Sequence, residues 1–228
     1  MKKQIFSFII SAVFAISVPI SVYSANFNDT KGHWAENTIN RLADMGIVNG
    51  VSASEFNPNG IVTRAEYLKM MMNLAKIETV PARNGECLEV KTDEWYADYL
   101  QSALDKALIP QEMIASYKVN LSTDEEGTKV HYSGAFNGDL PIEREQMAVL
   151  TMHLHQYSLD ADNVKNISTS AITFTDIDNI SVWAQPSVRL AVAYGFIEGM
   201  DDGSFQPRET ATRAQAVTLL GRIIDNAN

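Results

Sequence analysis

The chain has 228 residues, 28 acidic against 18 basic side chains, a formal charge of −10, 46% hydrophobic residues and one cysteine. This composition is ordinary for a globular protein, so it excludes collagen-like, low-complexity and wholly disordered chains. A single cysteine excludes an internal disulfide framework and a zinc site built from several thiolates, and the acidic excess argues against a general nucleic-acid binder.

The first 24 residues have the pattern of a secretory signal peptide. Lys2 and Lys3 precede an uncharged apolar run over residues 5–20, and small side chains before Ser24 and Ala25 suit cleavage after either residue. The alternative is a retained N-terminal anchor helix, although the run is short for a membrane span. We therefore expect an exported protein with no membrane association after cleavage, held at the cell surface by non-covalent contacts.

Two parts of the chain repeat each other in register. The motif Phe-x-Asp at 27–29 recurs at 174–176, and Trp-Ala at 34–35 recurs at 183–184. From each tryptophan onward the spacing is constant, with a glycine after 12 residues, a phenylalanine 10 residues later and an arginine 8 residues after that. Such a match over some thirty positions indicates internal duplication. The matched residues are Trp34, Gly46, Phe56 and Arg64 in one copy, and Trp183, Gly195, Phe205 and Arg213 in the other.

A third, degenerate copy lies between these two. It has Trp95, an alanine at 107 where the glycine would be, and Phe136 eight residues before Arg144. This copy lacks the Phe-x-Asp opening and contains 19 additional residues before its phenylalanine. The predicted organisation is a signal peptide at 1–24, repeat 1 at 25–80, a degenerate repeat 2 at 81–165 with an insertion around 111–135, and repeat 3 at 166–228.

Each repeat is predicted to contain two helices. In the first, apolar residues recur at helical spacing and a glycine in the left-handed conformation ends the helix at Gly46 or Gly195. The second begins with a capping box, Thr63 with Glu66 or Thr212 with Gln215. Each unit buries one face only against its neighbours, so we expect three helix–loop–helix repeats around a common axis in one all-α domain. The predicted stripes of the first helix are Ala35, Ile39, Leu42 and Ala43, and Ala184, Val188, Ala191 and Val192.

The insertion in repeat 2 has a different periodicity. Apolar residues alternate with polar ones over 117–121 and again over 128–132, on either side of a turn-rich stretch at 122–127. Alternation of this kind predicts a small β-hairpin, either as exposed decoration or as an edge that binds a partner.

The repeated arginines occupy an unfavourable place. Arg64 and Arg213 follow their N-caps directly, where the helix dipole opposes a cation by about 0.3–1 kcal/mol. One explanation is an anion site made by free backbone N–H groups and the guanidinium fork. The alternative is that each arginine pairs with a carboxylate such as Asp29 or Asp176. The tryptophans could likewise stack on sugar rings or belong to the core.

Enzymatic interpretations are weak. His153 and His155 are two residues apart, so on a helix they point in different directions and cannot readily share a metal ion. Asp201-Asp202-Gly203 lacks the later ligands of a calcium loop. Glu143 and Glu145 flank an arginine without any recognisable substrate cleft. We therefore expect no enzymatic activity, no cofactor and no metal ion.

These motifs in series resemble the S-layer homology (SLH) family in its usual three copies. Phe-x-Asp, Trp-Ala, Gly-Ile-Val-x-Gly, Phe-x-Pro and Thr-Arg-Ala-Glu carry the resemblance. It implies a pseudo-three-fold helical domain that binds a secondary cell-wall polysaccharide, often pyruvylated, on peptidoglycan. In repeat 2, Glu143 and Glu145 replace the Thr and Ala of the motif and would repel an anion, so the groove of Arg144 is expected to bind least. The residues that the resemblance and the repeats single out as ligand-binding are Arg64, Arg213, Arg144, Trp34, Trp183, Trp95, Asp29 and Asp176.

The sequence thus predicts a module that anchors a bacterial protein to the cell wall by binding an acidic polysaccharide. The alternative is a structural protein of the surface layer, whose triplet and hairpin bind other surface-layer proteins. No nucleic-acid partner is expected.

Overall fold

The computed structural model describes residues 26–83, 88, 90–124, 127–158 and 173–226. The predicted signal peptide lies outside these ranges. Within them, no helix has the length and apolar character that crossing a membrane requires. The elements in chain order are the 3-10 helix η1 (Asn28–Thr30), α1 (Glu36–Asp44), α2 (Arg64–Leu74), α3 (Ala97–Asp105), η2 (Gln111–Met113), β1 (Ala115–Asp124), β2 (Gly127–Ala135), α4 (Arg144–Ser158), η4 (Ile177–Asn179), α5 (Gln185–Ala193) and α6 (Arg213–Asn226).

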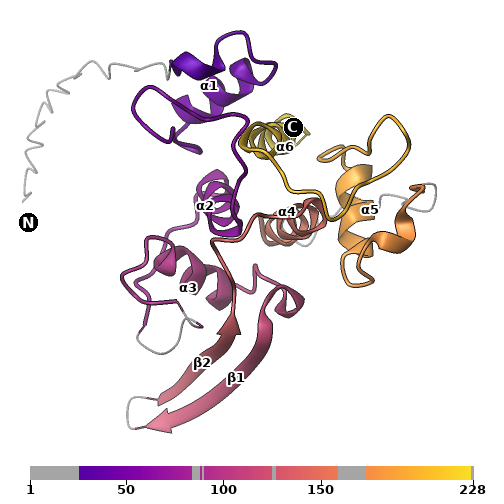
Figure 1. Cartoon of the computed structure of the whole chain (residues 1–228). Helices are drawn as coiled ribbons and strands as arrows, with labels where there is room; N and C mark the ends of the chain where they lie inside the picture. Colours follow the sequence, from indigo (N-terminus) through magenta and orange to yellow (C-terminus); the bar gives the residue numbers. More distant parts are fainter. Residues whose placement is uncertain (1–25, 84–87, 89, 125–126, 159–172, 227–228) are drawn as a thin grey trace, which may run out of the picture.

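Three inner helices, α2, α4 and α6, gather at the centre of the molecule and are seen end-on in Figure 1. Each begins at one of the repeated arginines, Arg64, Arg144 or Arg213. The outer helices α1, α3 and α5 each occupy one of three similar corners around this centre (Figure 1). The three sequence repeats therefore produce an approximate three-fold arrangement.

Each outer helix packs against the inner helix of the preceding repeat. Helix α3 contacts α2, α5 contacts α4, and α1 contacts α6, which closes the ring between the two ends of the described chain. Arg41 of α1 also forms an ion pair with Asp225 of α6 at 2.6 Å. Because the partner of every outer helix comes from another repeat, no repeat can bury its apolar face alone.

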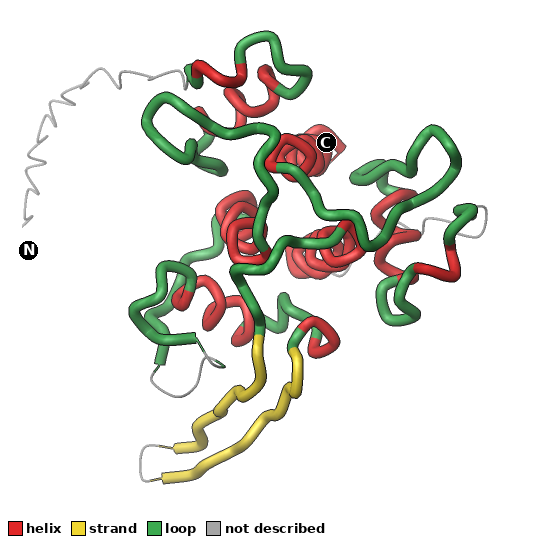
Figure 2. The backbone as a smooth tube through the Cα atoms, viewed as in Figure 1, coloured by secondary structure: helices red, strands yellow, loops and turns green. Residues whose placement is uncertain are grey.

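Extended segments cross above the inner helices and bond to one another in a cycle (Figure 2). The amide of Val62 donates to the carbonyl of Ala211, that of Ala211 donates to Ile142, and that of Ile142 donates to Val62, at 3.0–3.2 Å. These three residues stand two positions before the three arginines, so they are equivalent by repeat. Isolated antiparallel bridges join the same segments at Ile61 and Thr212, Thr63 and Pro141, and Glu143 and Thr210.

The predicted hairpin is present and projects from the corner that contains α3 (Figure 1). Strands β1 and β2 pair antiparallel with Val119 opposite Tyr132, Leu121 opposite Val130, and Thr123 opposite Thr128. The register therefore agrees with the alternation of the sequence. A bulge interrupts the pairing near the base of β1, after Ala115.

The all-α fold class is nevertheless wrong, because the structure is a mixture of helix and strand. The hairpin strands span 10 and 9 residues, and the segments before the inner helices are extended and bridged as well. The physical reason lies in the backbone at the centre of the molecule. Buried amide and carbonyl groups need partners, and three extended segments that meet at an axis can supply them to one another.

The helix ends follow the sequence signals closely. In the capping box of α2, Glu66 N donates to Thr63 Oγ1 and Thr63 N donates to the Glu66 carboxylate, as predicted. Gly46 and Gly195 adopt φ values of 72° and 71°, which confirms their left-handed conformation. Ala107, the equivalent in repeat 2, is also left-handed, with φ 52°.

One continuous core extends through all three repeats. The predicted stripes of the first helices contribute to it, and Ile39, Leu42, Val188 and Ala191 have no exposed surface. At the centre, fully buried Tyr67 of α2 shares a hydrogen bond of 2.7 Å with Thr151 of α4.

Candidate functional site

The guanidinium group of each repeated arginine lies over the phenylalanine ring of the next repeat. The three side chains are 5–7% exposed, so the guanidinium groups are largely removed from solvent. Such a cation above an aromatic ring is stabilised by the negative face of the ring. The pairs are Arg64 over Phe136 at 4.7 Å, Arg144 over Phe205 at 5.1 Å and Arg213 over Phe56 at 4.6 Å from the ring centroid.

Two of the arginines make the same pair of bonds to the backbone. Arg213 donates from Nε to the carbonyl of Phe56 at 2.9 Å and from Nη2 to that of Asn49 at 2.8 Å. Arg144 donates from Nε to Phe205 at 3.0 Å and from Nη2 to Glu198 at 2.9 Å. In both cases Nε and Nη2 are held by carbonyls, while Arg213 Nη1 lies 3.4 Å from Glu66 Oε1.

Arg64 departs from this pattern. Its Nη2 donates to the carbonyl of Met113 in η2, within the insertion. Its Nε is buried and has no acceptor among the described residues. Arg64 lines neither of the two grooves described below.

The backbone N–H groups at these helix starts are already engaged. The amide of Arg213 donates to Gly60, that of Ala214 donates to Pro58, and that of Gln215 donates to the Thr212 hydroxyl. Helix α2 has the same three bonds, to Leu140, Gly138 and its own cap. The sequence-based expectation of free N–H groups is therefore wrong, and any anion would have to meet the guanidinium groups themselves.

Burial lowers the pKa of each of the three arginines, and neighbouring carboxylates oppose this effect. Glu66 and Asp29 act on Arg213 in this way, and Asp176 acts on Arg144. Because an unperturbed arginine titrates far above neutrality, all three remain cations at physiological pH.

Asp29 and Asp176 hold the loops on which two of the arginines rest. Asp29 accepts the amides of Phe56 at 2.9 Å and Asn57 at 2.6 Å. Asp176 accepts those of Phe205 and Gln206, both at 2.8 Å. Each carboxylate thus fixes a phenylalanine whose carbonyl binds an arginine, and influences that arginine by charge alone.

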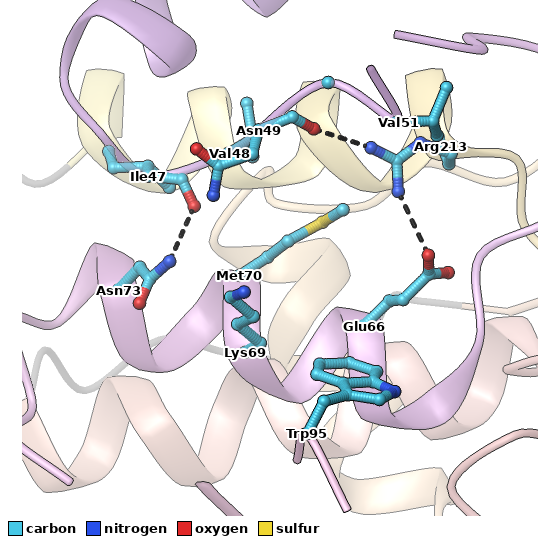
Figure 3. Close-up of a pocket in the computed structure, with 11 residues that line it drawn as sticks. Ile47, Val48, Asn49, Val51, Glu66, Lys69, Met70, Asn73, Trp95 and Arg213 are labelled. Carbon is cyan, nitrogen blue, oxygen red and sulfur yellow. Dashed lines mark hydrogen bonds and ion pairs between the residues drawn. The ribbon is translucent and has the colours of Figure 1, made fainter. Parts of the chain in front are cut away.

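A pocket of about 240 Å³ lies where three repeats meet, and we call it the Arg213 groove. Figure 3 shows Arg213 bonded to Asn49 and Glu66 at one side, with Trp95 below Glu66 and Lys69 farther along α2 toward Asn73. Its walls are the loop after α1, the outward side of α2, and the starts of α3 and α6. The lining residues are Ile47, Val48, Asn49, Gly50, Val51, Glu66, Lys69, Met70, Asn73, Trp95 and Arg213.

A second pocket of about 200 Å³, the Arg144 groove, repeats the first position by position. Arg144 replaces Arg213, Trp34 replaces Trp95, and Gln215 replaces Glu66. Its walls are the loop after α5, the side of α6, and the starts of α1 and α4. The lining residues are Trp34, Arg144, Met147, Phe196, Ile197, Glu198, Gly199, Met200, Gln215, Thr218, Leu219 and Arg222.

The tryptophans in these grooves are exposed. Trp34 has 65% and Trp95 48% of its surface accessible, whereas Trp183 is half-buried and packs against the core. Lys69 places its ammonium group 5.6 Å from the ring centroids of both Trp95 and Tyr99. The core interpretation of the tryptophans is therefore wrong for Trp34 and Trp95.

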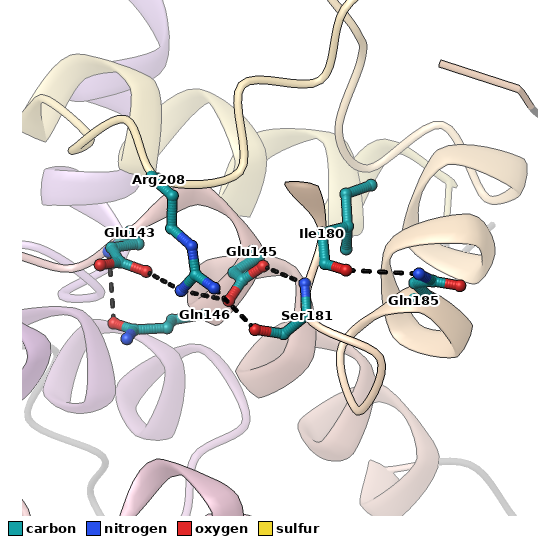
Figure 4. A network of polar contacts seen from close by, with 7 residues as sticks. All are labelled: Glu143, Glu145, Gln146, Ile180, Ser181, Gln185 and Arg208. Atoms are coloured by element: carbon teal, nitrogen blue, oxygen red, sulfur yellow. Dashed lines mark hydrogen bonds and ion pairs between the residues drawn. The ribbon is translucent and has the colours of Figure 1, made fainter. Parts of the chain in front are cut away.

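The carboxylates beside Arg144 both pair with Arg208 (Figure 4). Arg208 Nη1 lies 2.9 Å from Glu143 and 2.8 Å from Glu145, and Ser181 N donates to Glu145 at 2.9 Å. The Glu145 side chain is completely buried. Arg208 thus offsets part of the negative charge of this pair, and neither Glu143 nor Glu145 lines the Arg144 groove.

Several groove residues were not predicted from the sequence. They include the equivalent pair Lys69 and Thr218, and the equivalent pair Asn73 and Arg222. They stand at fixed offsets after the arginines, so the repeat register could have indicated them. It could not show that they share a groove with a tryptophan from another repeat.

His155 belongs to an aromatic cluster. Its ring packs against Tyr194 at 4.7 Å and Phe196 at 5.0 Å between centroids. Across the ranges that the structure describes, no group of three or more His, Cys, Asp or Glu residues is placed to hold a metal ion.

The family model of the S-layer homology domain matches residues 26–68 and 173–217. The chain thus contains two regions that match the SLH domain. These ranges contain the Trp-Ala and Thr-Arg-Ala motifs of the first and third copies. The middle copy is outside the match, but the structure places its Trp95 and Arg144 at positions equivalent to those of the other copies.

The chain is similar to much longer proteins. It is 29% identical over 205 residues to exoglucanase XynX of Acetivibrio thermocellus, covering 90% of this chain and 17% of that protein. It is 25% identical over 226 residues to the S-layer protein sap of Bacillus anthracis, covering 97% and 24%. It is 22% identical over 233 residues to the surface-layer 125 kDa protein of Lysinibacillus sphaericus, covering 99% and 17%. The chain thus spans less than a quarter of each of these relatives.

A glucanase and two surface-layer proteins have different overall roles, yet all contain a region like this one. What they share is a region similar to this chain, and the SLH matches within it indicate a cell-surface anchoring module.

Proposed function

We propose that this protein attaches non-covalently to the bacterial cell wall by binding an acidic secondary polysaccharide, of the pyruvylated kind, in the Arg213 and Arg144 grooves. The observation that carries the proposal is the duplication of one arrangement. In both grooves a buried arginine and an exposed tryptophan, from different repeats, line one pocket.

The chemistry of the grooves suits a charged sugar. A flat indole offers an apolar face for a pyranose ring, while the guanidinium fork can donate to a carboxylate of the same residue. Two arms of each fork are already held by carbonyls, so little side-chain entropy would be lost on binding. Asp29 and Asp176 would serve as positioning residues, and the proposal gives no sugar to Trp183 and Arg64, which line neither groove.

An acidic protein can bind an acidic polymer in this way because the position of its cationic groups matters more for binding than its net charge. The formal charge of −10 disfavours indiscriminate association with wall anions. Two grooves on one rigid domain would in addition bind a repeating polymer with an avidity greater than that of either groove.

The proposal is tested by co-sedimentation of the mature protein with purified cell walls, before and after acid extraction of the wall polymer. We expect binding to intact walls and its loss after extraction. Binding that survives removal of the polymer, or no binding to intact walls, would refute the proposal. We propose no enzymatic activity, and wall localisation follows from export and this attachment.

A second candidate function is assembly with other surface-layer proteins through the hairpin. Val119 and Leu121 point to the same face of β1 and are 48% and 70% exposed. The variant with Val119→Lys and Leu121→Lys, in which both changes are at exposed sites, should then lose binding to polymer-free surface-layer sheets while it still sediments with walls. Equal binding of both proteins to the sheets would eliminate this candidate.

A further inference from the structure

The middle repeat keeps a loop whose capping carboxylate it has lost, and we infer that the pocket beside this loop binds a small α-amino acid. The pocket has a volume of about 340 Å³ and lies beside Phe136, next to the end of β2, and we call it the Phe136 pocket. It shares no lining residue with the Arg213 and Arg144 grooves, so it is a separate site.

The loop after Phe136 has the same backbone shape as its equivalents in the other repeats. The residue that follows the repeated phenylalanine is left-handed in each case, with φ 59° at Asn57, 53° at Asn137 and 57° at Gln206. The N–H groups of Phe136 and Asn137 are therefore presented in the same way as the two pairs that an aspartate accepts in repeats 1 and 3.

Repeat 2 supplies no aspartate to these two N–H groups. The residue five positions before the tryptophan is Asp29 in repeat 1 and Val90 in repeat 2, and Val90 lines the pocket. The N–H groups of Phe136 and Asn137 have no acceptor among the residues that the structure describes. A ligand with two acceptor oxygens on one carbon atom, as in a carboxylate, can replace the missing side chain.

The charged side chains of the pocket favour a ligand that carries a cation as well. Lys91, Glu94 and Asp139 line it and are exposed, and within the described ranges none of them forms an ion pair. Glu94 and Asp139 stand at the positions of His33 and Asn59 in repeat 1, whose side chains lie 3.3 Å apart. Two carboxylates are thus placed on neighbouring sides of the pocket with a single lysine, so a simple anion is disfavoured there.

An α-amino acid carries both of the required groups on one carbon atom. Its carboxylate can accept from the N–H groups of Phe136 and Asn137, as an aspartate does in the other repeats. Its ammonium group can donate to Glu94 and Asp139, which neutralises part of their charge. The volume of the pocket is near the lower limit of small-molecule sites, which suits an amino acid with a small side chain such as alanine.

Binding can be measured at the two amides themselves. The mature protein is titrated with L-alanine, and the backbone amide signals of Phe136 and Asn137 are followed in ¹⁵N NMR spectra. We expect both signals to shift together and to saturate. Acetate and methylammonium each supply only one of the two charged groups, so each should bind at least about tenfold more weakly than alanine.

The Val90→Asp variant supplies a carboxylate from within the chain, at the spacing that Asp29 has before Trp34. We expect it to shift the Phe136 and Asn137 signals without any ligand, to raise the melting temperature by about 2–4 °C, and to abolish alanine binding. The Val90→Ala variant is the matched control, because it removes the same side chain without adding an acceptor. It should still bind alanine.

The double variant Glu94→Gln with Asp139→Asn tests the cationic half of the ligand. Both changes are at exposed sites, so the melting temperature should not change. Alanine should bind about tenfold more weakly, whereas acetate should bind more tightly because two repelling charges are gone. Glu55→Gln removes a charge from an exposed site outside the pocket and should change neither affinity.

Three results would each overturn the inference. They are the absence of a shift at Phe136 and Asn137 with alanine, equal affinities for alanine and acetate, and alanine binding that Val90→Asp leaves intact. Co-sedimentation with walls is measured separately and does not depend on this pocket, so the proposed anchoring function stands or fails independently.

Discussion

Gly221 of α6 lies directly against Thr38 of α1, where a β-carbon at Gly221 would come within 2.8 Å of Thr38 Cγ2. Non-bonded carbon atoms normally stay about 3.5–4.0 Å apart. The contact joins the last inner helix to the first outer helix, which are far apart in sequence and close the ring of repeats. The glycine is therefore required by packing between repeats, and not by its backbone conformation.

Gly221→Ala should destabilise the protein although alanine is the better helix former. Overpacking costs about 1–3 kcal/mol and the gain in helix propensity is about 1 kcal/mol, so we expect a net loss of about 1 kcal/mol. Urea denaturation provides the measurement. The double variant with Thr38→Ser, which lacks the opposing methyl group, should recover most of this loss, and failure to recover would show that the contact is not the cause.

Ala107→Gly should stabilise the protein. Ala107 is left-handed with φ 52°, at the position where the other repeats have Gly46 and Gly195. Alanine in this conformation is strained by about 1–2 kcal/mol. This strain exceeds the free-energy cost of the greater entropy that glycine has in the unfolded chain, so the free energy of unfolding should rise by about 0.5–1 kcal/mol. The reverse change, Gly46→Ala, should cost a similar amount in the same denaturation assay. Destabilisation by Ala107→Gly would contradict the strain argument.

Stability should fall with acid in a way that depends on Asp29. Burial alone would raise the pKa of Asp29. The amides of Phe56 and Asn57 and the charge of Arg213 nevertheless hold this pKa below its ordinary value. A carboxyl with a lowered folded-state pKa stabilises the fold fully above the unfolded pKa, near 4, and loses this effect as pH falls through the folded-state value. Denaturation midpoints from pH 6 to pH 2.5 should therefore decline less steeply in Asp29→Asn than in the unmodified protein.

A parallel decline in both proteins would show that Asp29 does not contribute. The Asp176→Asn variant can be compared with Asp29→Asn in the same assay, because Asp176 accepts the two equivalent backbone amides in repeat 3.

Trp34→Ala and Trp95→Ala should each weaken wall binding about tenfold with little effect on folding, since both rings are largely exposed in their grooves. Tyr157→Ala is the control, because Tyr157 is 48% exposed and lines neither groove. Wall co-sedimentation and thermal melting measure the two effects. If Tyr157→Ala weakens binding as much as the tryptophan variants, the grooves are not the site of attachment.

The sequence alone determined the local structure of this protein. Rare residues at constant spacing revealed the repeats, and short-range signals located the capping box at Thr63 and the left-handed Gly46. The alternation over residues 117–132 predicted the hairpin. These features depend on contacts between residues that are near in sequence, so their patterns can be read along the chain.

Only the tertiary structure decided which residues form a site. Arg213, Glu66 and Trp95 belong to three different repeats, and nothing local in their segments states that they share a groove. The cycle of bonds through Val62, which overturned the all-α expectation, has the same origin. Both arise from contacts between different repeats, and helical periodicity shows that a face is apolar without showing what covers it.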